Sequence, residues 1–153
     1  MDDRGWSSLP GLFFAQAERL GDKPFLWHKQ EGAYRPLTYR RTAELVAQLA
    51  RGLAALGIAA GDRVALVAEN RPEWLIADIA IMTLGAITVP TFTSNTPADH
   101  RHILTHSGAK AAIVSGGAIA KRVLAAALEA PDLDFISAME PLDRAQRPAA
   151  RLL

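Results

Sequence analysis

Three short apolar runs, separated by helix-length segments, constrain the fold of this chain most strongly. They are Val64–Ala68, Ala86–Val89 and Ala111–Ser115. A short run without polar alternation is typical of a strand buried on both faces, as in a parallel sheet. Residues 133–137 form a fourth candidate strand. Strands that alternate with helices imply right-handed βαβ units, so we predict a doubly wound, Rossmann-like α/β fold: a parallel sheet with flanking helices.

Capping residues and glycines mark where the helices begin and end. Leu9–Leu20 carries apolar residues at helical spacing, with Ser8 placed to cap its start. The longest helical pattern starts after Thr38 and ends near Leu56, where Gly57 follows. The same features predict three further helices, at about 72–84, 97–107 and 117–130.

Two short extended segments lie between the first two helices. They cover Pro24–Lys29 and Ala33–Tyr39, and Glu31-Gly32 separates them as a turn. This pattern predicts a β-hairpin outside the main sheet. With 153 residues, the chain is expected to form one domain. We expect residues 1–140 to form a truncated α/β unit and residues 141–153 an irregular tail without helical or strand periodicity.

Composition excludes several functional classes. The net charge of +1 offers no basic surface for nucleic acid. The chain has no cysteine, which excludes disulfides, thiolate metal sites and a cysteine nucleophile. The N-terminus lacks the apolar core of a signal peptide, so a cytoplasmic location is predicted. Residues 74–92 are mostly apolar, but Asp78 and Pro90 favour a buried helix followed by a buried strand over a transmembrane segment, while peripheral membrane contact stays open.

Polar residues gather where the first buried run ends. Glu69, Asn70 and Glu73 follow that run directly. Ligands of open α/β sheets bind outside the carboxyl ends of the strands. Together with Thr91–Ser94 and Gly116, these residues are candidates for a rim that faces a ligand. The simpler alternative is that Asn70 caps a helix and Glu73 complements the helix dipole.

Two other features have a structural interpretation that we favour. Gly116-Gly117 lies where a strand turns into a helix, which indicates a tight turn rather than a phosphate-binding loop. His100, His102 and His106 share one predicted helix, and we expect a solvated polar face rather than a metal site, because no further ligand stands at a fixed spacing. Phosphate-binding motifs of the P-loop or G-x-G-x-x-G type do not occur.

Six short motifs appear in a fixed order along the chain. They are Thr38-Tyr39, Leu53–Ile58, Gly61–Ala65, Glu69–Trp74, Gly85–Pro90 and Ser107–Lys110. The series resembles the N-terminal region of AMP-forming acyl-CoA synthetases, members of the adenylate-forming superfamily. The Glu-Asn-Arg-Pro-Glu-Trp run is most similar to the long-chain fatty acid branch. The resemblance covers roughly residues 9 to 138 and implies a partial N-terminal domain of the adenylate-forming fold.

This resemblance implies the reaction of the full-length family. Fatty acid, ATP and CoA give acyl-CoA, AMP and pyrophosphate, with Mg²⁺ as cofactor. In that family the phosphate loop ending in Pro-Lys-Gly, the Tyr-Gly-x-Thr-Glu and Thr-Gly-Asp segments and the catalytic lysine lie downstream, and none occurs here. We therefore expect an inactive N-terminal fragment, with no catalytic, cofactor-binding or metal-ligating residue assigned and no cofactor of its own.

Two alternatives stay open beside the fragment. The chain is either a free-standing α/β binding or interaction module derived from that family, or a small Rossmann-like nucleotide-binding protein. For the fragment we expect self-association, because the missing residues would leave surface uncovered. An unpaired sheet edge and the apolar residues Leu12, Phe13 and Leu20 of the first helix need a partner surface.

Overall fold

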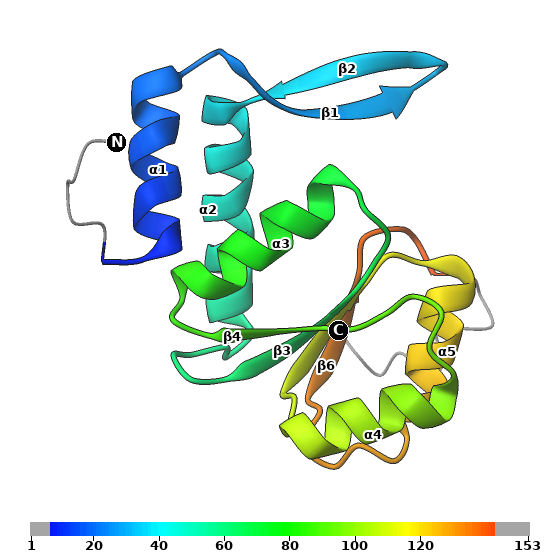
Figure 1. Cartoon of the computed structure of the whole chain (residues 1–153). Helices are drawn as coiled ribbons and strands as arrows, with labels where there is room; N and C mark the ends of the chain where they lie inside the picture. Colours follow the sequence, from blue (N-terminus) through cyan, green and yellow to red (C-terminus); the bar gives the residue numbers. More distant parts are fainter. Residues whose placement is uncertain (1–6, 143–153) are drawn as a thin grey trace.

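The computed structural model describes residues 7–142 (Figure 1). Its elements, in chain order, are α1 (Leu9–Leu20), β1 (Pro24–Gln30), β2 (Ala33–Thr38), α2 (Tyr39–Ala55), β3 (Arg63–Val67), α3 (Pro72–Thr83), β4 (Ile87–Pro90), α4 (Pro97–Ser107), β5 (Ala111–Val114), α5 (Gly117–Ala127) and β6 (Phe135–Ala138). Residues 143–153 of the predicted tail lie outside the described residues, so the division at residue 140 stays a prediction.

A four-stranded parallel sheet in the order β4-β3-β5-β6 forms the centre of the molecule. α2 and α3 lie on one face, and α4 and α5 cover the other (Figure 1). Along β3, Val64 and Leu66 pack in the cluster with α2 and α3, whereas Ala65 and Val67 pack in the cluster with α4 and α5. Both faces of the strand are therefore buried, and the predicted doubly wound α/β fold is confirmed.

β4 departs from the prediction of a strand buried on both faces. It lies at the edge of the sheet and, within the described part of the chain, pairs only with β3. The side chain of Ile87 is 52% exposed. The prediction was wrong because an apolar run does not distinguish an internal strand from an edge strand, and helices cover the margin of a sheet less completely than its centre.

The N-terminal elements α1, α2 and the β1–β2 hairpin form a layer that packs against α3. Ser8 caps α1 by accepting a hydrogen bond from the Gly11 amide at 3.2 Å. Glu31 and Gly32 both have positive φ, at 51° and 81°, as a two-residue hairpin turn requires, and the predicted hairpin is confirmed. Phe25 of β1 contacts Phe13 of α1 with ring centroids 5.6 Å apart, which attaches the hairpin to the helices.

Two of the six sequence motifs, Gly61–Ala65 and Ser107–Lys110, meet at the amino ends of β3 and β5. Arg63 donates hydrogen bonds to the carbonyl oxygens of Ser107, at 2.8 Å, and Gly108, at 2.7 Å. Lys110 forms an ion pair with Asp62 at 3.0 Å. These motifs therefore hold the connections before β3 and β5 together, on the side of the sheet away from the carboxyl ends.

The apolar stretch over residues 74–92 forms most of α3, the turn after it and β4. Within residues 7–142, no helix has the length and apolar character needed to cross a bilayer. The predicted order of a helix followed by a strand is confirmed for this segment, whereas the strand is an edge strand and not a buried one.

Candidate functional site at the carboxyl edge of the sheet

The carboxyl ends of the four strands bring distant segments together. The parallel ladder continues past the strands, with the Thr91 amide donating to Leu66 and the Ser115 amide to Val67, each at 3.1 Å. The Glu140 amide donates to the Ser115 carbonyl at 3.0 Å. The residues that follow β3, β4, β5 and β6 therefore share one edge, where ligands of such sheets bind.

A cavity of about 640 Å³ opens between the segments that follow β3 and β4. We call it the rim cavity; it is lined by Ala68, Glu69, Asn70, Trp74, Pro90, Thr91, Phe92 and Thr93. Most of the predicted rim is thus brought together. Glu69 is the one ionisable side chain among these lining residues, so the cavity offers a binding wall with apolar patches at Trp74 and Phe92 rather than an acid–base pair.

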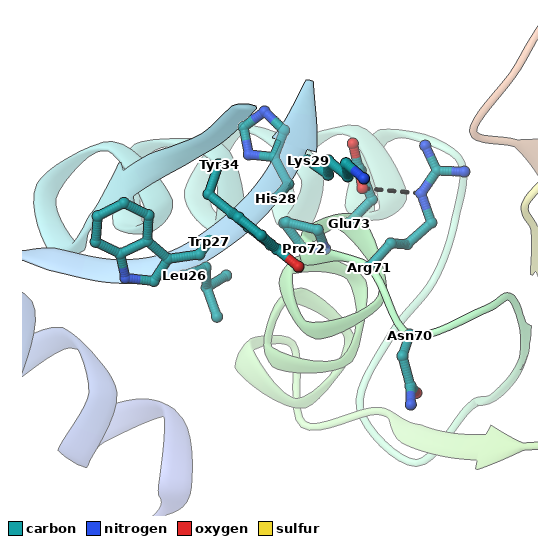
Figure 2. A pocket seen from close by; sticks show the side chains of 9 residues that line it. All are labelled: Leu26, Trp27, His28, Lys29, Tyr34, Asn70, Arg71, Pro72 and Glu73. Atoms are coloured by element: carbon teal, nitrogen blue, oxygen red, sulfur yellow. Dashed lines mark hydrogen bonds and ion pairs between the residues drawn. The ribbon is translucent and has the colours of Figure 1, made fainter. Parts of the chain in front are cut away.

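A second cavity, of about 630 Å³, lies on the other side of Asn70. We call it the hairpin cavity; it is lined by Leu26, Trp27, His28, Lys29, Tyr34, Asn70, Arg71, Pro72 and Glu73. Figure 2 shows Trp27 and Tyr34 on the hairpin and Arg71 joined to Glu73 beside the start of α3. Glu73 therefore lines the hairpin cavity and not the rim cavity, whereas the next residue, Trp74, lines the rim cavity.

Arg71 links the segments that follow β3 and β6, a role that was not predicted from the sequence. It is the N-cap residue of α3, without a side-chain capping bond, so the prediction of Asn70 as the cap was wrong. Its guanidinium lies 2.9 Å from Glu73 and 2.6 Å from Glu140, which follows β6. The hydrogen bonds that Arg71 donates to these two carboxylates raise its pKa, the bond to Glu73 contributing most. Nothing in the sequence around Arg71, which lies between Asn70 and Pro72, indicates that its partner Glu140 is 69 residues away.

Arg71 also sets the charge state of Glu73. Partial burial raises the pKa of the Glu73 carboxyl, but hydrogen bonds from Arg71 and from its own backbone amide bring that pKa below its ordinary value. Glu73 therefore stays ionised in the first turn of α3, where a negative charge complements the helix dipole.

Gly116 does not line the rim cavity. A Cβ at this position would lie 2.9 Å from the Cβ of Glu140, so glycine is what permits the close approach of the segment after β6. Gly117 has φ of 52° and begins α5. This geometry is that of a tight strand-to-helix turn.

The three histidines of α4 occupy different environments. His102 and His106 are exposed and stack with ring centroids 5.5 Å apart. His100 is only 1% exposed, so the prediction of a solvated face was wrong for this residue. It lies on the side of α4 that faces the segment after β4, a position that helical spacing alone does not reveal. Across residues 7–142, no three histidine or acidic side chains are grouped to hold a metal ion.

A family model described as AMP-binding enzyme matches residues 13–151. The chain belongs to the AMP-binding enzyme family. Among curated members, it is 28% identical over 131 residues to the chloroplastic long-chain-fatty-acid–[acyl-carrier-protein] ligase AEE15 of Arabidopsis thaliana, covering 86% of this chain and 18% of that protein. It is 38% identical over 79 residues to the long-chain-fatty-acid–CoA ligase FadD15 of Mycobacterium tuberculosis, covering 52% of this chain and 13% of that protein.

Solved structures of AMP-binding enzymes share the fold. The N-terminal domain of FACL13 from Mycobacterium tuberculosis superposes with a TM-score of 0.76 at 25% identity, covering 93% of this chain and 35% of that one. The adenylation domain of a carboxylate reductase from Mycobacterium chelonae gives a TM-score of 0.78 at 21% identity, covering 98% of this chain and 25% of that one, which shows the fold alone. The resemblance to the N-terminal region of adenylate-forming enzymes is confirmed, and the chain spans 13–18% of the first curated relatives it matches.

Proposed function

We propose that this chain is the N-terminal part of an ATP-dependent long-chain fatty acyl-CoA ligase and does not itself carry the catalytic residues. Two observations support this proposal. The family model matches residues 13–151, and the chain covers only a small share of each relative. The relatives named as long-chain fatty acid ligases support a fatty acid as the substrate of the whole enzyme.

The rim cavity supports a role in binding rather than in phosphate chemistry. ATP with Mg²⁺ needs cationic groups and metal-binding carboxylates around its phosphates. The rim cavity is lined by one carboxylate, Glu69, and by no lysine or arginine. These residues do not fit a triphosphate, so we derive no step of adenylation from them. They fit a neutral or apolar part of a substrate, in contact with Trp74 and Phe92.

An activity assay of the chain alone tests the proposal that it lacks the catalytic residues. We expect no ATP–pyrophosphate exchange above a protein-free blank when the chain is incubated with Mg²⁺ and a panel of fatty acids, because none of the family's phosphate-handling motifs occurs between Met1 and Leu153. Exchange above the blank would contradict this proposal. Binding of ATP or AMP by the chain alone would instead favour a small nucleotide-binding protein.

The DNA that follows codon 153 tests the fragment itself. A reading frame that continues into the family's phosphate loop supports an N-terminal part of a longer ligase. A stop codon, together with a stable product of 153 residues, favours the free-standing interaction module. The predicted cytoplasmic location remains a prediction, which fractionation of the source cells would check. Self-association is part of the proposal and is tested below.

A further inference from the structure

The segment over residues 91–96, which we call the rim loop, is held by groups from two helices. The hydroxyl of Thr91 lies 3.3 Å from Nδ1 of His100 on α4, and the side-chain Nδ2 of Asn95, within the loop, donates to the same hydroxyl at 3.4 Å. Arg122 on α5 donates from Nη2 to the carbonyl oxygen of Thr93. Thr91 and Thr93 also line the rim cavity, so α4 and α5 hold one wall of that cavity in place.

His100 is held in a buried site next to a positive charge. It is 1% exposed, and among the described residues its Nε2 has no hydrogen-bond partner; the same holds for the buried Nε of Arg122. The charged groups that face the His100 ring are Arg122 from α5 and Asp99 from α4 itself, while Thr91 and Asn95 of the rim loop are neutral.

The environment of His100 favours its neutral form. Burial lowers the pKa of the imidazole most, the charge of Arg122 lowers it further, and Asp99 opposes both only partly. Because the pKa of His100 in the folded chain lies below its ordinary value of 6.5, this group contributes stability that is fully present above pH 6.5 and is lost as the pH falls below that value.

We propose that His100 is a positioning residue for the rim cavity and that its protonation at acid pH loosens the rim loop at Thr91. A protonated ring would place a second positive charge beside Arg122 in a buried site, which is costly. The ring relieves that cost by moving toward solvent. Such a movement breaks the contact between the ring and the Thr91 hydroxyl. The bond from Arg122 to Thr93, the bond from the Thr91 amide to Leu66 and the cap at Thr96 remain. The importance of this movement for substrate binding rests on the proposed function, but the movement itself does not.

Trp74 lines the rim cavity and therefore reports on the loop opposite it. In a W6F/W27F variant Trp74 is the one remaining tryptophan, because the chain has three. We expect acrylamide quenching of its fluorescence to rise about twofold as the pH is lowered from about 7.5 through the midpoint at which His100 becomes protonated. The added substitution His100→Gln should abolish this rise, because glutamine does not titrate. His102→Gln, an exposed residue on the same helix, is the matched control and should leave the rise unchanged.

A second measurement covers the case in which His100→Gln fails to fold. In the unmodified chain, NMR titration should show the His100 ring and the backbone amides of residues 91–96 changing with one common midpoint below pH 6.5. Arg122→Met should raise that midpoint, because it removes the nearby positive charge. Rim-loop amides that do not follow the His100 midpoint, or a quenching change that persists in His100→Gln, would overturn the proposal. Neither measurement uses ATP or a fatty acid, so failure of the proposed ligase function would leave this result unaffected.

Discussion

At the scale of single residues, Gly108 illustrates why one motif has the sequence it has. Its φ is +60°, and a Cβ would lie 2.6 Å from Nη2 of Arg63. That same Nη2 donates to the carbonyl oxygen of Gly108. Glycine is therefore required twice, once for the backbone conformation and once for the approach of the guanidinium that joins the segments before β3 and β5.

We predict that Gly108→Ala lowers the free energy of unfolding by about 2–3 kcal/mol, because it combines backbone strain with displacement of Arg63. Gly57→Ala is the matched control: its φ is +90°, but no atom lies within 4 Å of the added Cβ. We expect it to cost only about 1 kcal/mol. Urea unfolding followed by circular dichroism measures both, and equal losses would show that the contact with Arg63 contributes nothing.

At the scale of elements, α4 begins with a complete capping box. The hydroxyl of Thr96 accepts from the Asp99 amide at 3.3 Å, and the Asp99 carboxylate accepts from the Thr96 amide at 2.9 Å. Hydrogen bonds from the Thr96 amide and hydroxyl lower the pKa of Asp99. This cap also fixes the end of the rim loop. Thr96 and Asp99 therefore support both the start of α4 and the wall of the rim cavity.

Thr96→Ala is expected to destabilise the chain by about 1 kcal/mol, since it leaves an amide of the first helical turn without its partner. Thr105→Ala, at an exposed position within the same helix, serves as the control and should be neutral or slightly stabilising because alanine favours helix. Thermal unfolding of both variants checks this. A loss in Thr105→Ala as large as that in Thr96→Ala would exclude the cap as the cause.

At the scale of the whole molecule, the edge at β4 presents an apolar surface. Ile87 is 52% exposed on β4, and Phe92, just beyond it, is 78% exposed. The strand has an open hydrogen-bonding edge within residues 7–142. An open strand edge next to large exposed apolar side chains favours pairing with another chain or with further residues of the same protein.

We therefore predict that the isolated chain self-associates at micromolar concentration and that Ile87→Lys shifts it toward monomer, because a charge at a strand edge opposes pairing. Leu128→Lys adds the same charge at an 80% exposed residue at the end of α5 and should leave association unchanged. Sedimentation velocity over a concentration series measures both. A single monomeric species for the unsubstituted chain up to about 100 μM, with no binding of a hydrophobic dye, would contradict the prediction.

Local sequence by itself determined most of the elements of this protein. α1 has the predicted bounds Leu9–Leu20, the turn lies at Glu31-Gly32, and the buried runs of β3 and β5 predicted a parallel sheet that the structure contains. Helix caps, tight turns and hydrophobic periodicity each depend on a few neighbouring residues, so they can be recognised in the sequence without knowledge of the fold. The convergence of Asn70 and Thr91 followed from the same reasoning, because parallel strands end at a common edge.

Only the tertiary structure decided how equivalent local patterns differ. His100 and His102 share a helix, yet one is buried against the rim loop and the other is exposed. The runs of β3 and β4 are both apolar, yet only one is an internal strand. Arg71 meets Glu140 because β6 ends beside the start of α3. Each of these outcomes depends on which segments lie next to one another, and that is set by the packing of residues far apart in sequence, which no local pattern records.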